Sequence, residues 1–377
     1  MENEKPLIVA EVVGNMVSGG VESVLLNYYR AVNHEKIQFD FIVFNSSTYI
    51  PKAEIEKMGG RVYVVPSYSH LFAFQRSLKR LFDQNGYKII HSHINTLSVF
   101  SLLVAKKAGI PCRIAHSHST WGKHELLRNF IKLCLRPFSK VYATNLAACS
   151  QYSAKWLFGK KAVSEGRVFI LRNAIVVENF QFFEEKRKRI RHSFGIDNET
   201  FVVGHVGRFV TQKNHRYLLL VFKKLLEKRP NSVLLLLGDG PLISSVKQQA
   251  IQLGIDKFVI FVGAVQNANE FYSAMDVFLL PSFFEGLPVS GVEAQTNGLR
   301  CGFSSKISKE TVFTNQVSFF GISNGCVARW VDFLCQCKIG DRNPNASALA
   351  EKAGFSIKFS GSTLENYYLN LVAKARN

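Results

Sequence analysis

The sequence predicts an α/β protein with two Rossmann-like halves, each built on a parallel β-sheet with helices on both faces. Two observations support this prediction. The chain has 377 residues, which is too long for one ordinary hydrophobic core and fits two domains of comparable size. Short apolar runs, each beside a helix-like stretch, form one series in the first half of the chain and another in the second. This alternation is typical of parallel sheets.

The first series of predicted strands starts close to the N-terminus, and the second starts at Phe201. In the first half the runs lie at 7–13, 39–44, 62–65, 89–91, 113–116, 143–148 and 168–171. In the second half they begin with FVVGHVG and continue at 232–237, 259–262, 277–280 and 300–303. We therefore expect one sheet in each half.

A densely charged stretch separates the two series. Residues 178–198 include QFFEEKRKRIRHSFG and lack strand character. The predicted boundaries are 1–180 for the first domain, 181–198 for a linker and 199–361 for the second domain. Residues 362–377 predict a terminal helix that packs back toward the first domain. Its apolar face would carry Leu364, Tyr367, Tyr368, Leu371 and Val372.

The composition is that of a globular protein with a strongly basic surface. Hydrophobic residues make up 47% of the chain and charged residues 20%, which excludes the disordered and fibrous classes. The formal net charge of +19 indicates that something acidic meets the surface. Nucleic acid, anionic lipid and a phosphorylated substrate all fit this charge.

The cysteines and the N-terminus bear on the compartment. The seven cysteines are scattered and mostly lie in apolar runs, which is typical of reduced thiols in a cytoplasm. Cys335 and Cys337 lack a second pair or a nearby histidine, so no metal site is expected there. The N-terminal segment has acidic residues where a signal peptide needs basic ones. No run of roughly 18 apolar residues occurs, so any membrane contact is expected to be peripheral.

A glycine pair follows the first predicted strand and opens a helix. In SGGVES (18–23), Gly19 and Gly20 would let backbone N–H groups approach a ligand closely, and a helix N-terminus favours an anion. The alternative is a tight turn whose glycines adopt positive φ angles.

Two cations frame the loop after the first strand of the second half. In GRFVTQKN (207–214), four residues separate Arg208 from Lys213, so both could converge on one diphosphate. Ligands of open α/β sheets bind at the carboxyl edge of the strands, where this loop lies. Arginine offers a bidentate fork and lysine a point charge. A solvated basic loop is the alternative.

Two glutamates flank a turn in the most informative motif. Glu285 follows an apolar strand in PSFFEGLP (281–288), and Glu293 lies eight positions on, at the head of a helix. Carboxylates in these places can accept hydrogen bonds from sugar and ribose hydroxyls, while amides of the turn and the cations hold phosphates. Alternatively, the two acids face water or cap the helix.

Together these motifs resemble those of the family 4 glycosyltransferases, which have the two-lobed GT-B fold. Glu285 and Glu293 match the family's E-x7-E signature, Arg208 and Lys213 match its diphosphate-binding R-x4-K, and the glycine pair matches its N-terminal glycine loop. Further matches are GDGP at 238–241, FVG at 261–263 and YSAMD at 272–276. The resemblance spans nearly the whole chain in the right order.

Within the family, the sequence is most similar to bacterial capsular and exopolysaccharide enzymes. The segments that carry this similarity are GGVESVLLN (19–27), IQFDF (37–41) and HSH (116–118). The resemblance implies two Rossmann-like domains that face each other across a cleft. The first would bind the acceptor and the second the nucleotide sugar.

The resemblance also implies a role for each matched residue. Arg208 and Lys213 would bind the donor diphosphate, Glu293 the ribose and Glu285 a donor sugar hydroxyl. His118 falls where the family keeps a histidine beside the donor sugar. The remaining pocket groups are backbone groups of Gly286, Leu287 and Pro288 at the sugar and of Gly19 and Gly20 at the phosphates.

The sequence departs from the family pattern in two places. Arg300 replaces a proline and would add a cation near the donor, and Ser290-Gly291 stands where bulkier residues are common and would loosen the helix start. Three further histidines, His91, His93 and His116, lie at strand ends. A histidine there is more often a hydrogen-bonded structural residue than a catalyst.

No metal and no cofactor are expected. The chain has no D-x-D triplet, so Arg208 and Lys213 would stabilise the charge that develops on the leaving nucleoside diphosphate. Retention of configuration can arise from two displacements with a carboxylate nucleophile or from attack on the face of departure. The resemblance favours the second route, in which the leaving phosphate helps to deprotonate the acceptor, so no nucleophile is assigned.

Residues 123–140 predict a helix with an apolar and a basic face. The apolar face comprises Leu126, Leu127, Phe130, Ile131, Cys134 and Leu135, and the basic face Arg128, Lys132 and Arg136. Such a helix could lie in a membrane interface against anionic lipid. Residues 71–82, with Arg76, Lys79 and Arg80, are a lesser candidate. The alternative is a core-facing helix with a solvated basic side.

We therefore expect a retaining, metal-independent glycosyltransferase of capsular or exopolysaccharide biosynthesis. It would move a sugar from a nucleotide sugar, UDP-linked by resemblance, to a polyprenyl-diphosphate-linked saccharide. It would be cytoplasmic and peripherally bound to an anionic surface, the inner face of the cell membrane. A nucleotide-sugar epimerase of the same fold is one alternative, which needs a cluster of acid–base carboxylates. A non-enzymatic nucleic-acid-binding protein explains the charge but not the motifs, so no nucleic acid is expected.

Overall fold

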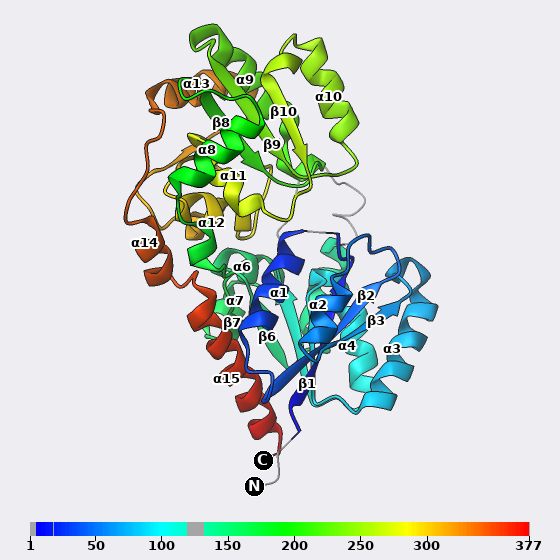
Figure 1. Cartoon of the computed structure of the whole chain (residues 1–377). Coiled ribbons are helices and arrows are strands. Elements are labelled where there is room, and N and C mark those ends of the chain that lie inside the picture. Colours follow the sequence, from blue (N-terminus) through cyan, green and yellow to red (C-terminus); the bar gives the residue numbers. More distant parts are fainter. Residues whose placement is uncertain (1–4, 18, 119–131, 377) are drawn as a thin grey trace. The chain divides into compact units, whose positions relative to one another are not determined.

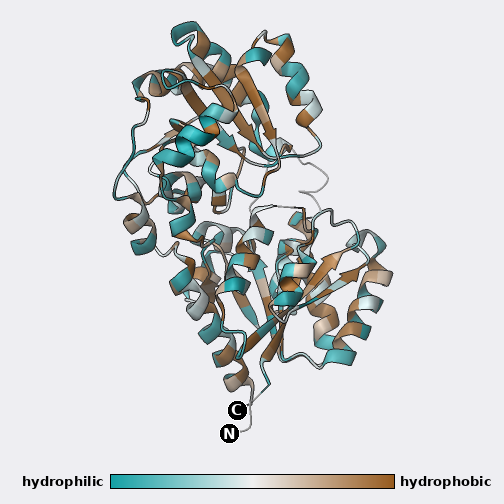
Figure 2. Cartoon of the chain, in the orientation of Figure 1, coloured by the Kyte–Doolittle hydropathy of each residue, from teal (hydrophilic) through white to brown (hydrophobic). Residues whose placement is uncertain are grey.

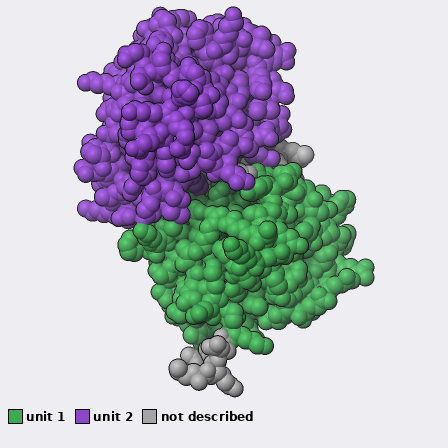
Figure 3. Space-filling model, viewed as in Figure 1, with its two compact units in different colours: residues 1–121, 125–175, 356–377 green, residues 122–124, 176–355 purple. Residues whose placement is uncertain are grey.

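The computed structural model describes residues 5–17, 19–118 and 132–376, which divide into two compact units (Figure 3). Residues 176–355 form unit 2, and the other described residues form unit 1. The chain leaves unit 1 after Ile175 and returns to it at Ser356. Each unit is a parallel sheet with helices packed against it (Figure 1).

Unit 1 is built on a seven-stranded sheet in the order β3-β2-β1-β4-β5-β6-β7. The strands are β1 (Leu7–Gly14), β2 (Ile37–Phe44), β3 (Arg61–Val65), β4 (Ile89–Ser92), β5 (Cys112–Ser117), β6 (Asn145–Ala148) and β7 (Val168–Ile170). The helices are α1 (Gly20–Ala31), α2 (Lys52–Lys57), α3 (Leu71–Asn85), α4 (Ser98–Lys107), α6 (Gln151–Phe158), α7 (Lys160–Ser164) and α15 (Ile357–Arg376). The strand order reverses between β1 and β4, and open α/β sheets bind ligands at the carboxyl ends of strands at such a point.

The two faces of this sheet differ in chemistry. Alternate strand residues pack with α3, α4 and α6 in an apolar core, which includes Ala10, Ile90 and Ala115. Because successive side chains of a strand point to opposite faces, the neighbours of these three residues face the other side. Those neighbours are Glu11, His91 and His116, all buried.

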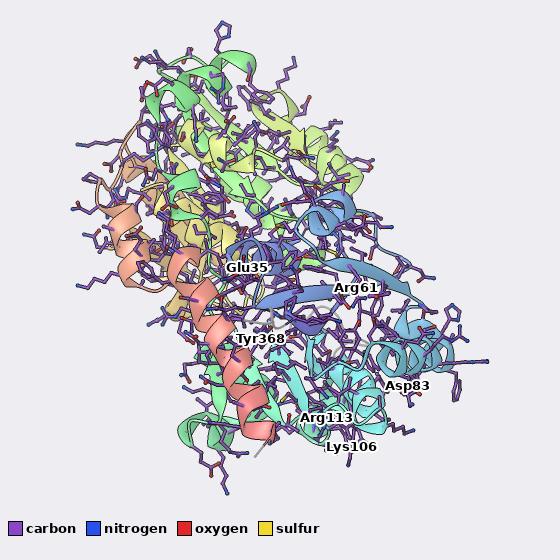
Figure 4. The ribbon with its side chains drawn as sticks, turned by 60° about the horizontal axis from the view of Figure 1, so that its bottom comes forward. Glu35, Arg61, Asp83, Lys106, Arg113 and Tyr368 are labelled. Carbon is purple, nitrogen blue, oxygen red and sulfur yellow. The ribbon has the colours of Figure 1, made fainter. Side chains whose placement is uncertain are left out.

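Helix α15 belongs to unit 1 although it follows unit 2 in sequence. It packs against α1, and the Ile357 N–H donates to the Ile175 carbonyl oxygen at 2.9 Å. Gly361 permits this close packing, because a Cβ there would lie 3.0 Å from the Ala31 carbonyl oxygen. Tyr368, labelled in Figure 4, is fully buried against unit 1. The helix begins five residues before the predicted start at 362.

Unit 2 is built on a six-stranded parallel sheet in the order β10-β9-β8-β11-β12-β13. The strands are β8 (Phe201–Val206), β9 (Ser232–Leu237), β10 (Val259–Gly263), β11 (Val277–Leu280), β12 (Arg300–Ser304) and β13 (Val317–Phe320). The helices are α8 (Glu184–Ser193), α9 (His215–Lys228), α10 (Ile243–Gln252), α11 (Ala268–Ala274), α12 (Val289–Thr296), α13 (Val327–Gln336) and α14 (Ala346–Lys352). Alternate residues of each central strand enter separate cores on the two faces, so most strand residues are apolar (Figure 2).

The charged stretch predicted as a linker is an integral part of unit 2. Most of 181–198 forms α8, which packs against α11. Arg187 and Arg191 of α8 point inward and pair with the buried Asp276 at 2.7 and 2.6 Å. The density of charge suggested a solvated connection, but ion pairing lets these two arginines be buried. The chain instead changes units at 175/176 and 355/356.

Every strand expected from the sequence overlaps an observed strand, and β13 is an additional one. Two parallel sheets with interspersed helices agree with the expected α/β architecture. Among the described residues, no helix combines the length and apolar character that crossing a membrane requires.

Candidate functional site

The loops after β8 and β9 are pressed together at the carboxyl edge of the unit 2 sheet. The Gly207 N–H donates to the Leu237 carbonyl at 3.0 Å, and the Phe209 N–H donates to the Asp239 carbonyl at 2.9 Å. Gly238 has a φ of +126°, and a Cβ there would lie only 2.3 Å from the Gly207 carbonyl oxygen. Glycine at 238 therefore fixes the start of the loop that carries Arg208 and Lys213.

Lys213 and Glu285 form a partly buried ion pair at this edge. Their Nζ and Oε1 atoms are 2.7 Å apart, and the two side chains are 16% and 9% exposed. Gln212 Nε2 donates to the other carboxylate oxygen of Glu285 at 3.1 Å and to the Phe284 carbonyl at 3.0 Å. Both oxygens of Glu285 are thus held by the loop after β8. The alternatives of a solvated lysine and a water-facing glutamate are wrong for this pair.

The backbone supports the same arrangement. The Phe283 N–H donates to the Gln212 carbonyl at 2.9 Å, and the Asn214 side-chain amide donates to the Pro281 carbonyl at 3.2 Å. Glu285 also forms a parallel bridge with Ile307. The turn that follows, Gly286, Leu287 and Pro288, is buried and leads directly into α12.

Glu293 lies in the middle of α12 and is half-buried. The Tyr272 hydroxyl donates to its Oε2 at 2.6 Å. Burial raises the pKa of Glu293 to about 7, while the Tyr272 hydrogen bond and the charge of Lys213 act in the opposite direction. A carboxylate with this pKa changes its charge, and hence its hydrogen-bonding character, near neutral pH.

Arg208 differs from Lys213 in its surroundings. Its side chain is exposed and forms no hydrogen bond or ion pair with any residue in the described ranges. It therefore fits either a solvated loop residue or a cation free to meet an anionic ligand. Arg300 does not reinforce this site as expected, because it starts β12 and so lies at the amino edge of the sheet.

The unit 1 glycines lie at the start of α1. Gly19 has a φ of −100° and Gly20 is the first helical residue, so the alternative of a positive-φ turn is wrong. A Cβ on Gly19 would lie 2.6 Å from a carboxylate oxygen of Glu22, at the movable end of that side chain, so packing alone does not require glycine here. The pair sits after β1, beside the point where the strand order reverses.

His118 follows β5 and belongs to a buried cluster of four histidines. Its Nε2 lies 2.8 Å from His93 Nδ1, and its backbone N–H donates to the Asn95 side chain at 2.8 Å. His91 Nε2 likewise lies 2.9 Å from His116 Nδ1. Burial lowers the pKa of all four, that of His93 to about 3, so the rings are neutral near pH 7.

Two residues that hydrogen-bond to these histidines, Glu11 and Tyr368, were not predicted as site residues. Glu11 is fully buried in β1, with Oε2 2.7 Å from His93 Nε2. The Tyr368 hydroxyl donates to Glu11 Oε1 at 2.8 Å and lies 2.6 Å from His91 Nδ1. An acid inside the apolar run LIVAEVV is a signal that could have pointed to Glu11. Tyr368 carried no such signal, because its aromatic ring suits an ordinary apolar helix face.

Comparison with known proteins identifies the family. Residues 18–179 match the family model described as Glycosyltransferase Family 4, and residues 186–307 match the model described as Glycosyl transferases group 1. The EpsF protein of Bacillus subtilis, described as a glycosyltransferase, is 34% identical over 312 residues, 80% of each chain. The protein is a family 4 glycosyltransferase. Its Arg208, Lys213, Glu285 and Glu293 fall in the group 1 match, and Gly19, Gly20 and His118 fall in the other.

A second relative and two solved structures extend the comparison. An Escherichia coli UDP-Gal:alpha-D-GlcNAc-diphosphoundecaprenol alpha-1,3-galactosyltransferase is 24% identical over 84% of each chain. The crystal structure of Anabaena HepE with UDP-glucose matches 97% of this chain and 100% of its own at a TM-score of 0.80 and 16% identity. The lipopolysaccharide glycosyltransferase WaaG matches 95% of this chain and 99% of its own at a TM-score of 0.70 and 15% identity. The GT-B fold expected from the sequence is confirmed.

Proposed function

We propose that this glycosyltransferase transfers a sugar, with retention of configuration, from a UDP-sugar to a polyprenyl-diphosphate-linked saccharide in capsular or exopolysaccharide biosynthesis. The observation that carries the proposal is the Lys213–Glu285 pair beside the free Arg208 at the carboxyl edge of the unit 2 sheet. The names of relatives support it, including the Staphylococcus aureus capsular polysaccharide glycosyltransferase CapH, 24% identical over 82% of this chain and 83% of its own. A structural neighbour holds UDP-glucose, and a relative is named for a diphosphoundecaprenol acceptor.

The two cations act on the leaving group. Lys213 has three N–H donors, so it can keep one on Glu285 and direct others to the donor diphosphate. Arg208 is free to turn toward the same oxygens and offer two parallel N–H groups. Together they oppose the negative charge that develops as the sugar departs, and the proposal requires no metal.

The remaining residues hold the sugar and the nucleoside. Glu285 accepts from a donor sugar hydroxyl, and Glu293 accepts from the ribose hydroxyls. We further propose that the backbone of the turn 286–288 and His118 contact the donor sugar, and that Gly19 and Gly20 contact its phosphates. The bond from the anomeric carbon to the phosphate oxygen breaks while the acceptor oxygen attacks from the same face. The acceptor proton passes to the leaving phosphate, so no protein nucleophile is needed.

We also propose that the enzyme works in the cytoplasm, peripherally at the inner face of the membrane. Of the predicted helix 123–140, residues 123–131 lie outside the described residues. The described remainder is α-helical at 132–135 and a 3-10 helix at Arg136–Lys140. Leu133 and Phe138 lie outside the predicted apolar face, but they are 42% and 53% exposed among basic residues, which supports contact with anionic lipid. Helix α3 covers the second, lesser candidate for membrane contact. Its apolar residues Phe74, Leu78 and Leu81 are buried in the core, and Phe72 is the exposed apolar residue of its first turn.

The proposed reaction is tested by incubating the protein with a UDP-sugar and a polyprenyl-diphosphate-linked sugar in vesicles. We expect transfer with retention, without added metal, and faster in vesicles containing anionic lipid than in neutral ones, because the net charge of +19 concentrates the protein there. Isomerised free nucleotide sugar would support the epimerase instead. Salt-sensitive RNA binding without turnover would support a nucleic-acid-binding protein.

The affinity for the donor should rise with pH. Because the pKa of Glu293 is about 7, its carboxylate form, the better acceptor for ribose hydroxyls, becomes populated as the pH rises through neutrality. If only this form binds well, affinity for UDP-glucose increases about tenfold from about pH 6 to about pH 8. Calorimetric titration measures the affinity at each pH. The diphosphate of UDP-glucose stays ionised between these pH values, so its own charge does not cause the change. Glu293→Gln should bind weakly with a flat profile, and an unchanged rise in that variant would contradict the assignment.

A further inference from the structure

The buried cluster in unit 1 forms one continuous hydrogen-bonded chain from α15 to His118. In order, the members are Tyr368, Glu11, His93 and His118, and a branch runs from Tyr368 through His91 to His116. The five contacts measure 2.6–2.9 Å between donor and acceptor atoms. His118 Nδ1 and His116 Nε2 are buried at the two ends and have no partner among the described residues.

These rings are arranged to bond to one another rather than to a shared cation. Nitrogens of His91, His93 and His116 lie within 4.8 Å of one another, which could suit a metal. However, His91 Nε2 and His116 Nδ1 are hydrogen-bonded to each other at 2.9 Å, so these two nitrogens point at one another and not at a shared ion. Both nitrogens of His91 and of His93 are already in hydrogen bonds.

A neutral imidazole has one donor and one acceptor nitrogen, so the proton positions along the chain are coupled. If Glu11 is ionised, its Oε2 accepts from His93 Nε2, His93 Nδ1 must then accept from His118 Nε2, and His118 Nδ1 is left as an acceptor. If Glu11 carries a proton on Oε2, it donates to His93 Nε2. His93 Nδ1 then donates to His118 Nε2, and His118 Nδ1 becomes an N–H donor.

The branch through Tyr368 does not change between these states. The Tyr368 hydroxyl donates to Oε1 of Glu11 in both, and its oxygen accepts from His91 Nδ1. His91 Nε2 then accepts from His116 Nδ1. Every hydrogen bond is satisfied in either state, so the proton on Glu11 alters only His93 and His118.

We infer that Glu11 is a positioning residue that sets, through His93, whether the buried Nδ1 of His118 donates or accepts a hydrogen bond. The consequence for catalysis rests on the proposed function, in which His118 contacts the donor sugar. Burial raises the pKa of Glu11 to about 8, and the hydrogen bond from Tyr368 acts against that rise. Among the described residues, Tyr368 from α15 and the two histidines His91 and His93 at the end of β4 lie within 3.7 Å of Glu11. His116 and His118, at the end of β5, bond to His91 and His93 in turn.

The direct test follows the ring nitrogens of His118 by ¹⁵N NMR on the full chain from about pH 6 to about pH 10. His118→Gln identifies its signals. We expect the proton to move from Nδ1 to Nε2 with a midpoint near the pKa of Glu11, about 8. In Glu11→Gln the amide donates permanently to His93, so the Nδ1–H form should persist at all pH values. A wild-type ring that never changes tautomer, or a Gln variant that changes as the wild type does, would overturn the inference.

The kinetic test separates this inference from the proposed function. Transfer should fall as the pH rises through about 8, and Glu11→Gln should abolish that decline while keeping activity at pH 7 within about threefold. Tyr368→Phe should move the decline to higher pH, because it removes a hydrogen bond that favours the ionised carboxylate. Tyr367→Phe on the same helix is the control and should leave the profile unchanged. If no transfer occurs in any variant, the proposed function fails, while the NMR result still decides the role of Glu11.

Discussion

Lys213→Ala should abolish sugar transfer while leaving the protein folded. The variant removes a cation that opposes charge on the leaving diphosphate, and it leaves the partly buried Glu285 without its ion-pair partner. Removing one such electrostatic group typically lowers kcat by about 10²–10³-fold, and the loss of Glu285 placement adds to this. Initial rates at saturating donor and acceptor measure the effect, with thermal unfolding as the check on folding. The control is Lys224→Ala, which removes an exposed lysine of α9 paired only with Glu227.

Glu285→Ala should have an equally large effect, because the two residues act as one unit. The loop after β8 holds both oxygens of Glu285, so the loss of the carboxylate also frees Lys213 and Gln212. Glu285→Gln keeps the size and one acceptor, and we expect it to recover some donor binding but little turnover. Near-normal turnover in either alanine variant would refute the site assignment.

Asp276→Ala should be the most destabilising substitution considered for unit 2. The buried Asp276 accepts from Arg187, Arg191 and the backbone N–H groups of Val202 and Gly340, at 2.6–2.9 Å. Its loss leaves two buried guanidiniums uncompensated, and breaking one side of a buried ion pair typically costs about 3–5 kcal/mol in the free energy of unfolding.

Urea unfolding followed by circular dichroism measures this loss. Asp332→Ala is the matched control, because Asp332 pairs with Lys228 at the surface, with both side chains more than half exposed. Exposed pairs contribute little, so its unfolding midpoint should stay close to that of the wild type. Equal losses in the free energy of unfolding for the two variants would show that the buried ion pairs of Asp276 stabilise the protein no more than an exposed pair does.

The sequence predicted strands well because parallel strands buried on both faces read as continuous apolar runs. Residues 277–280 and 232–237 are examples, since each enters a core on both sides of the unit 2 sheet. The half-buried β13 was not predicted, because VSFF is short and lies at the sheet edge. The prediction that 181–198 is a linker was wrong. The sequence alone does not show that Asp276, far along the chain, pairs with Arg187 and Arg191 of this stretch.

In the candidate site, too, the sequence predicted residues that lie in motifs but not the contacts between distant segments. Arg208, Lys213, Glu285 and Glu293 occur at motif spacings, so they could be found from the sequence. That Lys213 bonds to Glu285 rather than standing apart depends on how two loops from β8 and β11 meet. Glu11 and Tyr368 are 357 positions apart, and no local pattern predicts their hydrogen bond.

The return of the chain to unit 1 has a consequence for the order in which the protein is assembled. Unit 2 is one continuous stretch, 176–355, and is complete in sequence before α15 has been synthesised. Domains generally fold as units as they emerge from the ribosome, whereas unit 1 must wait for its last helix. Until Tyr368 arrives, Glu11 lacks one of its partners and the histidine cluster is open on that side. A nascent chain therefore finishes unit 2 first and completes the hydrogen-bonded histidine chain of unit 1 only at the end.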